Sequence, residues 1–241
     1  MPFIYECNPA YFEILPKEGI ISPNSSIIMQ GNLRGDFFKN IQSEEKVYLI
    51  SKLDTVKLQV VEYKSINDYS QVFFKPTKIL KSRQTYFLYI KGEYNPFSDE
   101  GNYSTWVNQN SRWTTSIDID TTPPKVIKQA KLKNKHSNYF AGGGYNYVAK
   151  FSIDYSDLNK TLALVQLKNE KNNEIKELYV PIVDSMISVS GSVCLNKFKL
   201  TSDIVFKARF KLIDYSLNQS IEWSEWQEFE FDNPFPKIIE K

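Results

Sequence analysis

The sequence predicts an all-β protein built from two tandem antiparallel β-sandwiches, and three observations support this. Aromatic residues make up 15% of the chain, and Ile, Val, Thr, Tyr and Phe dominate its apolar runs, which suits pleated, half-buried surfaces. Short stretches of alternating apolar and polar residues recur between clusters of Gly, Pro, Asn and Ser. No stretch keeps a 3.6-residue apolar period between helix caps, so any helix is expected to be short.

The strands are expected in two sets of about seven, the number typical of one sandwich. The first set is FEIL, SIIMQG, KVYLISK, VKLQVVEY, QVFFKP, TYFLYIKG and WTTSIDID. The second set is KVIKQAKLK, YVAKFSIDY, LALVQLKNE, IKELYVPIV, ISVSGSVCL, VFKARFKLID and WQEFEFD. Turn residues separate the members of each set.

Two prolines mark the boundary between the sets, in the segment Thr121–Pro124. They remove two amide donors and keep the preceding residues extended, so a strand ladder cannot continue through them. We therefore predict one domain over 1–120, a linker over 121–124 and a second domain over 125–241. So short a linker restricts the angle between the domains and favours a rod. The alternative is an edge-strand entry within one large sandwich.

The two halves share a repeat of about 120 residues. Leu80 precedes Tyr86 by six residues in LKSRQTYFLYIKG, and Leu200 precedes Phe206 at the same spacing in LTSDIVFKARFKLID. Each strand then leads to a turn with Asn and Ser followed by Trp, in GNYSTW and LNQSIEW. This order argues for two copies of one domain type.

LKSRQTYFLYIKG resembles the corner and penultimate strand of fibronectin type III and bacterial immunoglobulin-like domains. The resemblance implies that the hydroxyl of Tyr86 binds the upstream backbone. The opening ILPKEGIISPNSSIIMQGNL resembles bacterial immunoglobulin-like modules of surface-layer and secreted proteins, and DTTPPKV resembles the joints between such modules. The chain departs from the pattern where Phe206 lacks a hydroxyl and Ser82 stands where Pro is usual, and it has no Cys-Trp-Cys core.

Charge and cysteine content exclude several functional classes. The 30 Lys and Arg and 28 Asp and Glu are scattered along the chain, so we expect no nucleic-acid partner. Only Cys7 and Cys194 occur, which supports neither a disulfide framework nor a zinc site. No apolar run is long enough for a membrane span, and MPFIYECNPAYF lacks the features of a signal peptide, although one removed earlier would leave no trace.

No arrangement typical of catalysis stands out. His136 is the single histidine, in a polar stretch predicted to be a loop, and the G-x-S-x-G elbow of a serine hydrolase is missing. The acidic pairs Glu44-Glu45, Asp99-Glu100 and Glu228-Glu230 are each interpreted as solvated. We therefore predict no enzyme and no cofactor.

The glycine-rich stretch FAGGGYNY is not followed by the helix of a phosphate-binding loop and is interpreted as a loop leading into a strand. Its aromatic residues are expected to divide between core and surface. Exposed tyrosines there would form a contact surface.

Asparagine and aspartate residues raise two further hypotheses. Carboxylates from both sides of the joint could bind a structural calcium ion, although solvated acids are the simpler interpretation and no metal is predicted. The candidates are Asp118, Asp120, Asp154 and Asp157. Sequons begin at Asn24, Asn102, Asn159 and Asn218, and they matter only where the source glycosylates asparagine.

The W-S-E-W of Trp223–Trp226 resembles part of the W-S-x-W-S box of cytokine-receptor domains. Gln227 replaces the final Ser, and no basic residue stands ready to stack between the tryptophans. The stretch is therefore interpreted as a closing turn and strand, with Trp223 on the core side and Trp226 the more exposed.

These observations favour a non-enzymatic structural, adhesion or assembly module that binds a protein partner through loops or sheet edges. Its setting would be a bacterial surface, a secreted assembly, or a phage-like or secretion particle, so the expected location is extracellular or at the cell surface. The predicted contact residues are Trp106, Trp113, Tyr139, Tyr145 and Trp226. The alternative is a carbohydrate-binding module that uses Trp106 and Trp113 as stacking platforms.

Overall fold

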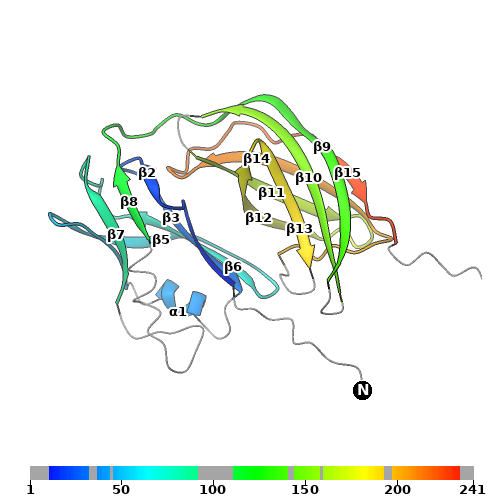
Figure 1. Ribbon diagram of the computed structural model, residues 1–241, viewed down its shortest axis with the longest axis horizontal. Helices are drawn as coiled ribbons and strands as arrows, with labels where there is room; N and C mark the ends of the chain where they lie inside the picture. Colours follow the sequence, from blue (N-terminus) through cyan, green and yellow to red (C-terminus); the bar gives the residue numbers. More distant parts are fainter. Residues whose placement is uncertain are drawn as a thin grey trace, which may run out of the picture.

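The computed structural model describes residues 11–32, 37–43, 46–91, 111–140, 144–157, 160–192 and 197–233. In this part of the chain, strands form two sheets, and the all-β prediction is confirmed (Figure 1). The strands are β1 (Tyr11–Leu15), β2 (Gly19–Ile21), β3 (Ile27–Asn32), β4 (Val47–Ile50), β5 (Thr55–Ile66), β6 (Tyr69–Pro76), β7 (Thr85–Ile90), β8 (Arg112–Thr115), β9 (Lys125–Phe140), β10 (Gly144–Ser156), β11 (Thr161–Asn169), β12 (Ile175–Val183), β13 (Met186–Ser192), β14 (Val205–Asp214) and β15 (Gln227–Glu230). The helix α1 spans Phe37–Ser43. Among the described residues, no helix is long and apolar enough to cross a membrane.

The first sheet contains the strands that precede the two prolines, in the order β1-β3-β6-β5-β4-β7-β8-β2. Its neighbours are antiparallel except β2 and β8, which run parallel. The long strand β5 connects two parts of the sheet, because Thr55–Lys57 pair with β4 and Leu58–Ile66 pair with β6. We call residues 11–120 the first half.

The second sheet has the order β15-β14-β11-β12-β13-β10-β9, and all its pairs are antiparallel. Here β12 is the connecting strand: Ile175–Pro181 pair with β11, and Ile182 and Val183 pair with β13. If β2 is left out, the strands of the two sheets correspond one to one in both sheet position and order along the chain. The first sheet then has the order β1-β3-β6-β5-β4-β7-β8, and the second, read from its other edge, has the order β9-β10-β13-β12-β11-β14-β15. The repeat seen in the sequence thus recurs as a repeated topology. We call residues 125–233 the second half.

Each half has an apolar core, and Tyr69 of the first half also belongs to the core of the second. In the first, Met29 of β3 and Phe74 of β6 belong to one buried cluster with Leu49 of β4, Leu88 of β7 and Trp113 of β8. The sheet therefore curves so that its two ends face each other across the core. The second half repeats this arrangement with a cluster centred on Phe151, Val165, Val189, Phe210 and Phe229. Burial of these side chains is the main stabilising term of either half.

A third apolar cluster joins the two halves. Ile28 of β3 and Phe73 of β6 pack with Leu164 of β11, Tyr179 of β12 and Ile213 of β14. The rings of Phe73 and Tyr179 lie 4.5 Å apart between centroids. Because the two faces of β3 and β6 meet different clusters, all residues of these strands except the half-buried Lys75 are buried, which explains their apolar runs. The halves therefore touch through packed surfaces as well as through the linker.

Buried polar groups also cross this interface. Nε2 of Gln71 donates to the carbonyl oxygen of Tyr179 at 2.7 Å, and the amide of Tyr179 donates to Oε1 of Gln71 at 2.9 Å. Gln71 also donates to Oε1 of Gln30, within the first half, at 2.6 Å. The side-chain amide of Gln71 thus forms both hydrogen bonds with the backbone of Tyr179, as a neighbouring strand would. This fixes how the halves are aligned, since sliding one half along the other would leave these buried groups without partners.

All fourteen predicted strand segments contain a strand, but several bounds differ. The strand within WTTSIDID, β8, ends at Thr115. The amide of Ser116 then donates to the carbonyl of Ile21, and the remaining residues of the segment are not in a strand. The predicted loop around His136 is wrong: this residue lies within β9 and pairs with Val148. The short β2 and α1 were not predicted individually.

The corner before β7 has the predicted hydrogen bond. Oη of Tyr86 accepts from the amide of Lys81 at 3.0 Å and lies 3.4 Å from Oδ2 of Asp54, to which it donates. Nζ of Lys81 also donates to the carbonyl of Leu53 at 3.3 Å. The β4–β5 turn, which carries Leu53 and Asp54, is thereby held against the corner. The implied role of Tyr86 is confirmed.

Candidate functional site

Of the two tryptophans proposed as sugar platforms, Trp113 is a core residue. Its side chain is 1% exposed, and its Nε1 donates to the carbonyl of Pro16 at 2.8 Å. The prediction that Trp113 is a contact residue is therefore wrong, because strand alternation turns it inward beside Tyr86. Trp106 lies outside the described residues.

Tyr139 and Tyr145 lie opposite each other at the end of the β9–β10 hairpin. Tyr139 is 62% exposed, and the two ring centroids are 5.3 Å apart at an interplanar angle of 63°. Tyr145 then contacts Tyr147, and Tyr147 contacts the buried Phe231. The expected division between core and surface is confirmed, since one row of rings runs from the core to solvent.

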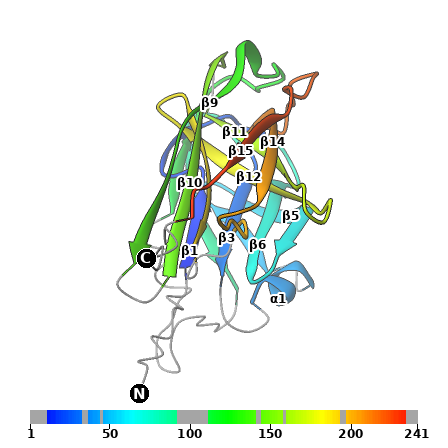
Figure 2. The ribbon, with the colours of Figure 1, turned by 90° about the vertical axis from the view of Figure 1, so that its right-hand side faces the viewer.

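The strand β9 forms an edge of the second sheet and runs beside β10 along one side of the molecule (Figure 2). Among the described strands, it pairs with β10 alone. Its exposed side chains include five lysines, Lys125, Lys128, Lys131, Lys133 and Lys135, and the single histidine, His136. Lys128 lies 3.4 Å from Asp154, and Lys135 donates to the carbonyl of Glu230. The cationic stretch is therefore a strand edge and not a loop.

The two tryptophans of the W-S-E-W stretch stack on a cation, and this cation does not come from their neighbours in sequence. The guanidinium of Arg209 on β14 lies 4.9 Å from the ring centroid of Trp223 and 4.6 Å from that of Trp226. Both tryptophans are half-buried. The expectation that no basic residue is available is therefore wrong, because the cation comes from the adjacent strand.

Two serines hold this segment against β14 without a regular ladder. Ser224 donates its amide to the carbonyl of Phe210, and its Oγ accepts from the amide of Phe210 at 2.9 Å. Ser220 forms the same pair of bonds with Leu212. The serine hydroxyls replace backbone carbonyls as acceptors, so residues 221–226 follow β14 as a bridged segment, and β15 begins only at Gln227. Trp223 and Trp226 therefore do not lie in a regular strand, and the expected alternation of Trp223 toward the core and Trp226 toward solvent does not apply to them.

Arg209 begins a polar network that reaches the first half. Its Nε donates to Gln166, and Gln166 donates to Glu177 at 2.7 Å. Lys64 of β5 contacts Glu177 and lies 3.0 Å from Glu62. Burial opposes the charge of Lys64, but the hydrogen bonds with Glu177 and Glu62 outweigh it and raise the pKa of Lys64. This partly buried ion network stabilises the same interface as Gln71.

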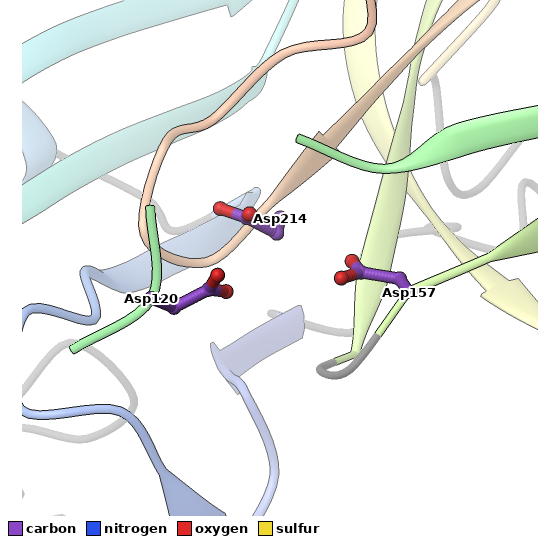
Figure 3. A group of neighbouring side chains, drawn as sticks. All are labelled: Asp120, Asp157 and Asp214. Carbon is purple, nitrogen blue, oxygen red and sulfur yellow. The ribbon is translucent and has the colours of Figure 1, made fainter. Parts of the chain in front are cut away.

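Three carboxylates meet where the linker joins both halves: Asp120 before the prolines, Asp157 after β10 and Asp214 at the end of β14 (Figure 3). One oxygen from each lies within 4.8 Å of the others. Oδ2 of Asp157 accepts from the hydroxyl of Thr161 at 2.5 Å, and the amide of Asn218 donates to Oδ1 of Asp214 at 3.0 Å. The side chains point toward a common space.

Asp214 is fully buried, and burial raises its pKa to about 6. Hydrogen bonds from Asn218 favour the charged form, whereas the neighbouring charges of Asp120 and Asp157 disfavour it. A divalent cation would reverse this balance, because oxygen ligands with net negative charge suit calcium. Calcium binding stays a hypothesis, and the carboxylates that it concerns are Asp120, Asp157 and Asp214. Asp118 is exposed and Asp154 faces Lys128, so neither joins the cluster.

Two of the sequon asparagines have a structural role at the joint. Nδ2 of Asn24 donates to the carbonyl of Asp120 at 2.7 Å, and Oδ1 of Asn24 accepts from its amide at 3.0 Å. Nδ2 of Asn218 donates to the same carbonyl at 3.1 Å and to Asp214 at 2.8 Å. Glycosylation of either nitrogen would break these bonds. Asn102 and Asn159 lie outside the described residues.

No family model and no curated protein matches the chain. Among solved structures, the similar ones include the pullulanase type I of Bacillus subtilis str. 168 complexed with maltose, which is 10% identical with a TM-score of 0.25. The match covers 91% of this chain and 24% of the pullulanase. A pullulanase from Anoxybacillus sp. LM18-11 complexed with maltotriose is 9% identical, with 90% and 25% covered and a TM-score of 0.27.

The β-glucuronidase of Bifidobacterium dentium complexed with coumarin-3-O-glucuronide is 7% identical, with a TM-score of 0.27. Here the match covers 92% of this chain and 46% of the glucuronidase. The chain thus spans less than half the length of each of these enzymes. At such low TM-scores, none of these likenesses bears on its function.

Proposed function

We propose that this chain is a non-enzymatic adhesion or assembly module that binds a protein partner along the β9–β10 hairpin. The observation that carries this proposal is the edge strand β9, which spans Lys125–Phe140 and pairs with β10 alone among the described strands. An edge strand offers backbone donors and acceptors to an added strand. Tyr139 and Tyr145 at its end add contact area at a small entropic cost.

The lysines of β9 determine which partner suits this edge. Like charges disfavour the pairing of two such edges with each other, which natural sheets use against self-association. An extended acidic segment would bring both backbone pairing and opposite charge. The partner proposed is therefore a protein segment rich in Asp or Glu, in an assembly outside the cell or at its surface.

The fold proposed for each half is an immunoglobulin or fibronectin type III sandwich. The repeated strand order and the hydrogen bond of Tyr86 at the corner support this assignment. Neither feature implies a particular activity, since such sandwiches carry many functions. The proposed function is therefore argued from the β9–β10 hairpin and not from the fold.

Site-specific photo-crosslinking tests the proposal. A photoreactive residue at Tyr139 or Lys131 is expected to form an adduct with a partner in extracts of the source cells, and excess unlabelled protein should compete for it. The control position is Leu53, which is 66% exposed on the other half. Equal labelling from Leu53 and Tyr139, or no adduct from either hairpin position, would contradict the proposal.

The carbohydrate-binding alternative has less support. A sugar platform needs an accessible ring face, but Trp113 is buried and Arg209 stacks on Trp226. The rings of Tyr139 and Tyr145 are inclined by 63° and do not form one flat surface. Binding on a glycan array that Tyr139→Ala abolishes would favour this alternative over a protein partner.

A further inference from the structure

A pocket of about 410 Å3 opens at one end of the second sheet. Its apolar part is formed by Leu167, Ile204 and Phe206, which belong to the core of the second half or pack against it. Its polar walls come from the β11–β12 turn and from the segment before β14. The volume lies in the range of about 300 to 1,000 Å3 that is usual for small-molecule sites.

The polar walls carry a positive charge. Lys171, Lys176 and Lys199 line the pocket, against one acid, Glu174. Lys176 lies 3.6 Å from Glu174, whereas Lys171 and Lys199 form no ion pair within the described part of the chain. Two ammonium groups at the mouth are thus available to an anion.

In the first half, hydrogen bonds cross the same place. Thr201 and Phe206 match Lys81 and Tyr86 in the repeat, and the β11–β12 turn matches the β4–β5 turn. In the first half, the Tyr86 hydroxyl, Asp54 and Lys81 hold that turn against the corner. Phe206 has no hydroxyl, and the pocket lies between the corner and the turn. The pocket is therefore a local departure from a repeated design.

We propose that this pocket binds a small organic anion of about monosaccharide size, with a carboxylate and an apolar ring face. The carboxylate would lie between the ammonium groups of Lys171 and Lys199, and the ring face would pack on Ile204 and Phe206. A neutral sugar lacks the group that the lysines recognise.

Titration calorimetry with glucuronate, N-acetylneuraminate and benzoate tests this proposal, with glucose as the neutral counterpart. At least one carboxylate is expected to bind saturably, more weakly at high salt, while glucose gives no heat. Lys199→Glu is expected to raise the Kd at least tenfold, and Lys52→Glu, the same charge change on the exposed surface of the first half, to leave it unchanged. Absence of binding by all three carboxylates, or equal losses in both variants, would overturn the proposal.

Discussion

The two corners of this protein have the same spacing but different chemistry. In the first half, the hydroxyl of Tyr86 binds the amide of Lys81 and reaches Asp54, so the corner and the neighbouring turn form one packed unit. In the second half, Phe206 fills the equivalent place in the core but ends without a polar atom, and a pocket of about 410 Å3 remains. The two corners therefore differ in the hydrogen bonds that join the corner to the neighbouring turn.

The second corner is held in another way. Near it, a Cβ built on Gly191 of β13 would lie 1.8 Å from the carbonyl oxygen of Phe198. The backbone before β14 thus passes directly over β13 at a residue without a side chain. The amide of Leu200 donates to that same carbonyl at 2.9 Å. The first corner depends on a side-chain hydrogen bond, whereas the second depends on close backbone contact.

The largest expected effect comes from Gly191→Ala. The added methyl group would force the Phe198 backbone away from β13, and such overpacking is expected to cost about 3 kcal/mol of unfolding free energy. Urea unfolding measures this loss. Ser190→Ala, at the adjacent position of the same strand, serves as the control and is expected to change stability by less than about 1 kcal/mol. Similar losses for both variants would show that the close contact is not what holds the second corner.

The carboxylate cluster of Asp120, Asp157 and Asp214 lies outside both corners and offers a test that is independent of them. Since burial raises the pKa of Asp214 to about 6 from 3.8, the folded state binds more protons than the unfolded state between these values. The Asp214 contribution therefore favours folding at acidic pH and is lost as pH rises from about 4 to about 6, by up to about 3 kcal/mol. Unfolding free energies of the wild type and Asp214→Asn across this range measure the difference, which should be the same in corner variants. A wild-type minus variant difference that is independent of pH would contradict the assignment.

Tyr86→Phe makes the first corner resemble the second. It leaves the backbone amide of Lys81 without its acceptor in a partly buried bond, so we expect a loss of about 1 kcal/mol in unfolding free energy. Tyr89→Phe removes a hydroxyl from an exposed tyrosine of the same strand and should be close to neutral. Equal effects of the two substitutions in thermal or urea unfolding would mean that the corner hydrogen bond contributes nothing.

Phe206→Tyr is the reverse substitution and has the smallest expected effect on stability. A hydroxyl at this position would extend into the pocket, where it could accept from the backbone as Tyr86 does, and a gain of about 0.5 to 1 kcal/mol is expected. It should also weaken carboxylate binding by occupying space. Phe87→Tyr, on an exposed strand position, controls for the added hydroxyl. A destabilised variant with intact ligand binding would show that the two corners are not equivalent.

Much of the fold follows from local sequence rules. The resemblance of the segment around Leu80 and Tyr86 to a fibronectin type III corner implies the hydrogen bond of Tyr86, and one short segment carries that resemblance. The sequence predicts Trp113 as a contact residue, whereas the structure buries it, because alternation gives two possible faces and does not say which is inside. The polar stretch around His136 predicts a loop, whereas pairing with β10 keeps this residue in a strand.

The site residues depend on contacts between distant segments. Arg209 reaches Trp223 and Trp226 only because Ser220 and Ser224 bind their segment to β14. Asp120 and Asp157 were expected near the joint, but Asp214 joins them through the return of β14, which no local pattern encodes. The sequence indicates the pocket only through Phe206, which lacks the hydroxyl of Tyr86. The volume and charge of the pocket can be determined only from the folded structure.

The interface around Phe73, Tyr179 and Gln71 has a consequence for how this protein can be recombined. Either half alone would expose Ile28 and Phe73, or Leu164 and Tyr179, to water, together with the hydrogen-bonding groups of Gln71 or Tyr179. A truncated half should therefore self-associate or require its counterpart added in trans. The transferable unit, for gene fusion or for engineering, is the pair of sheets and not the single repeat.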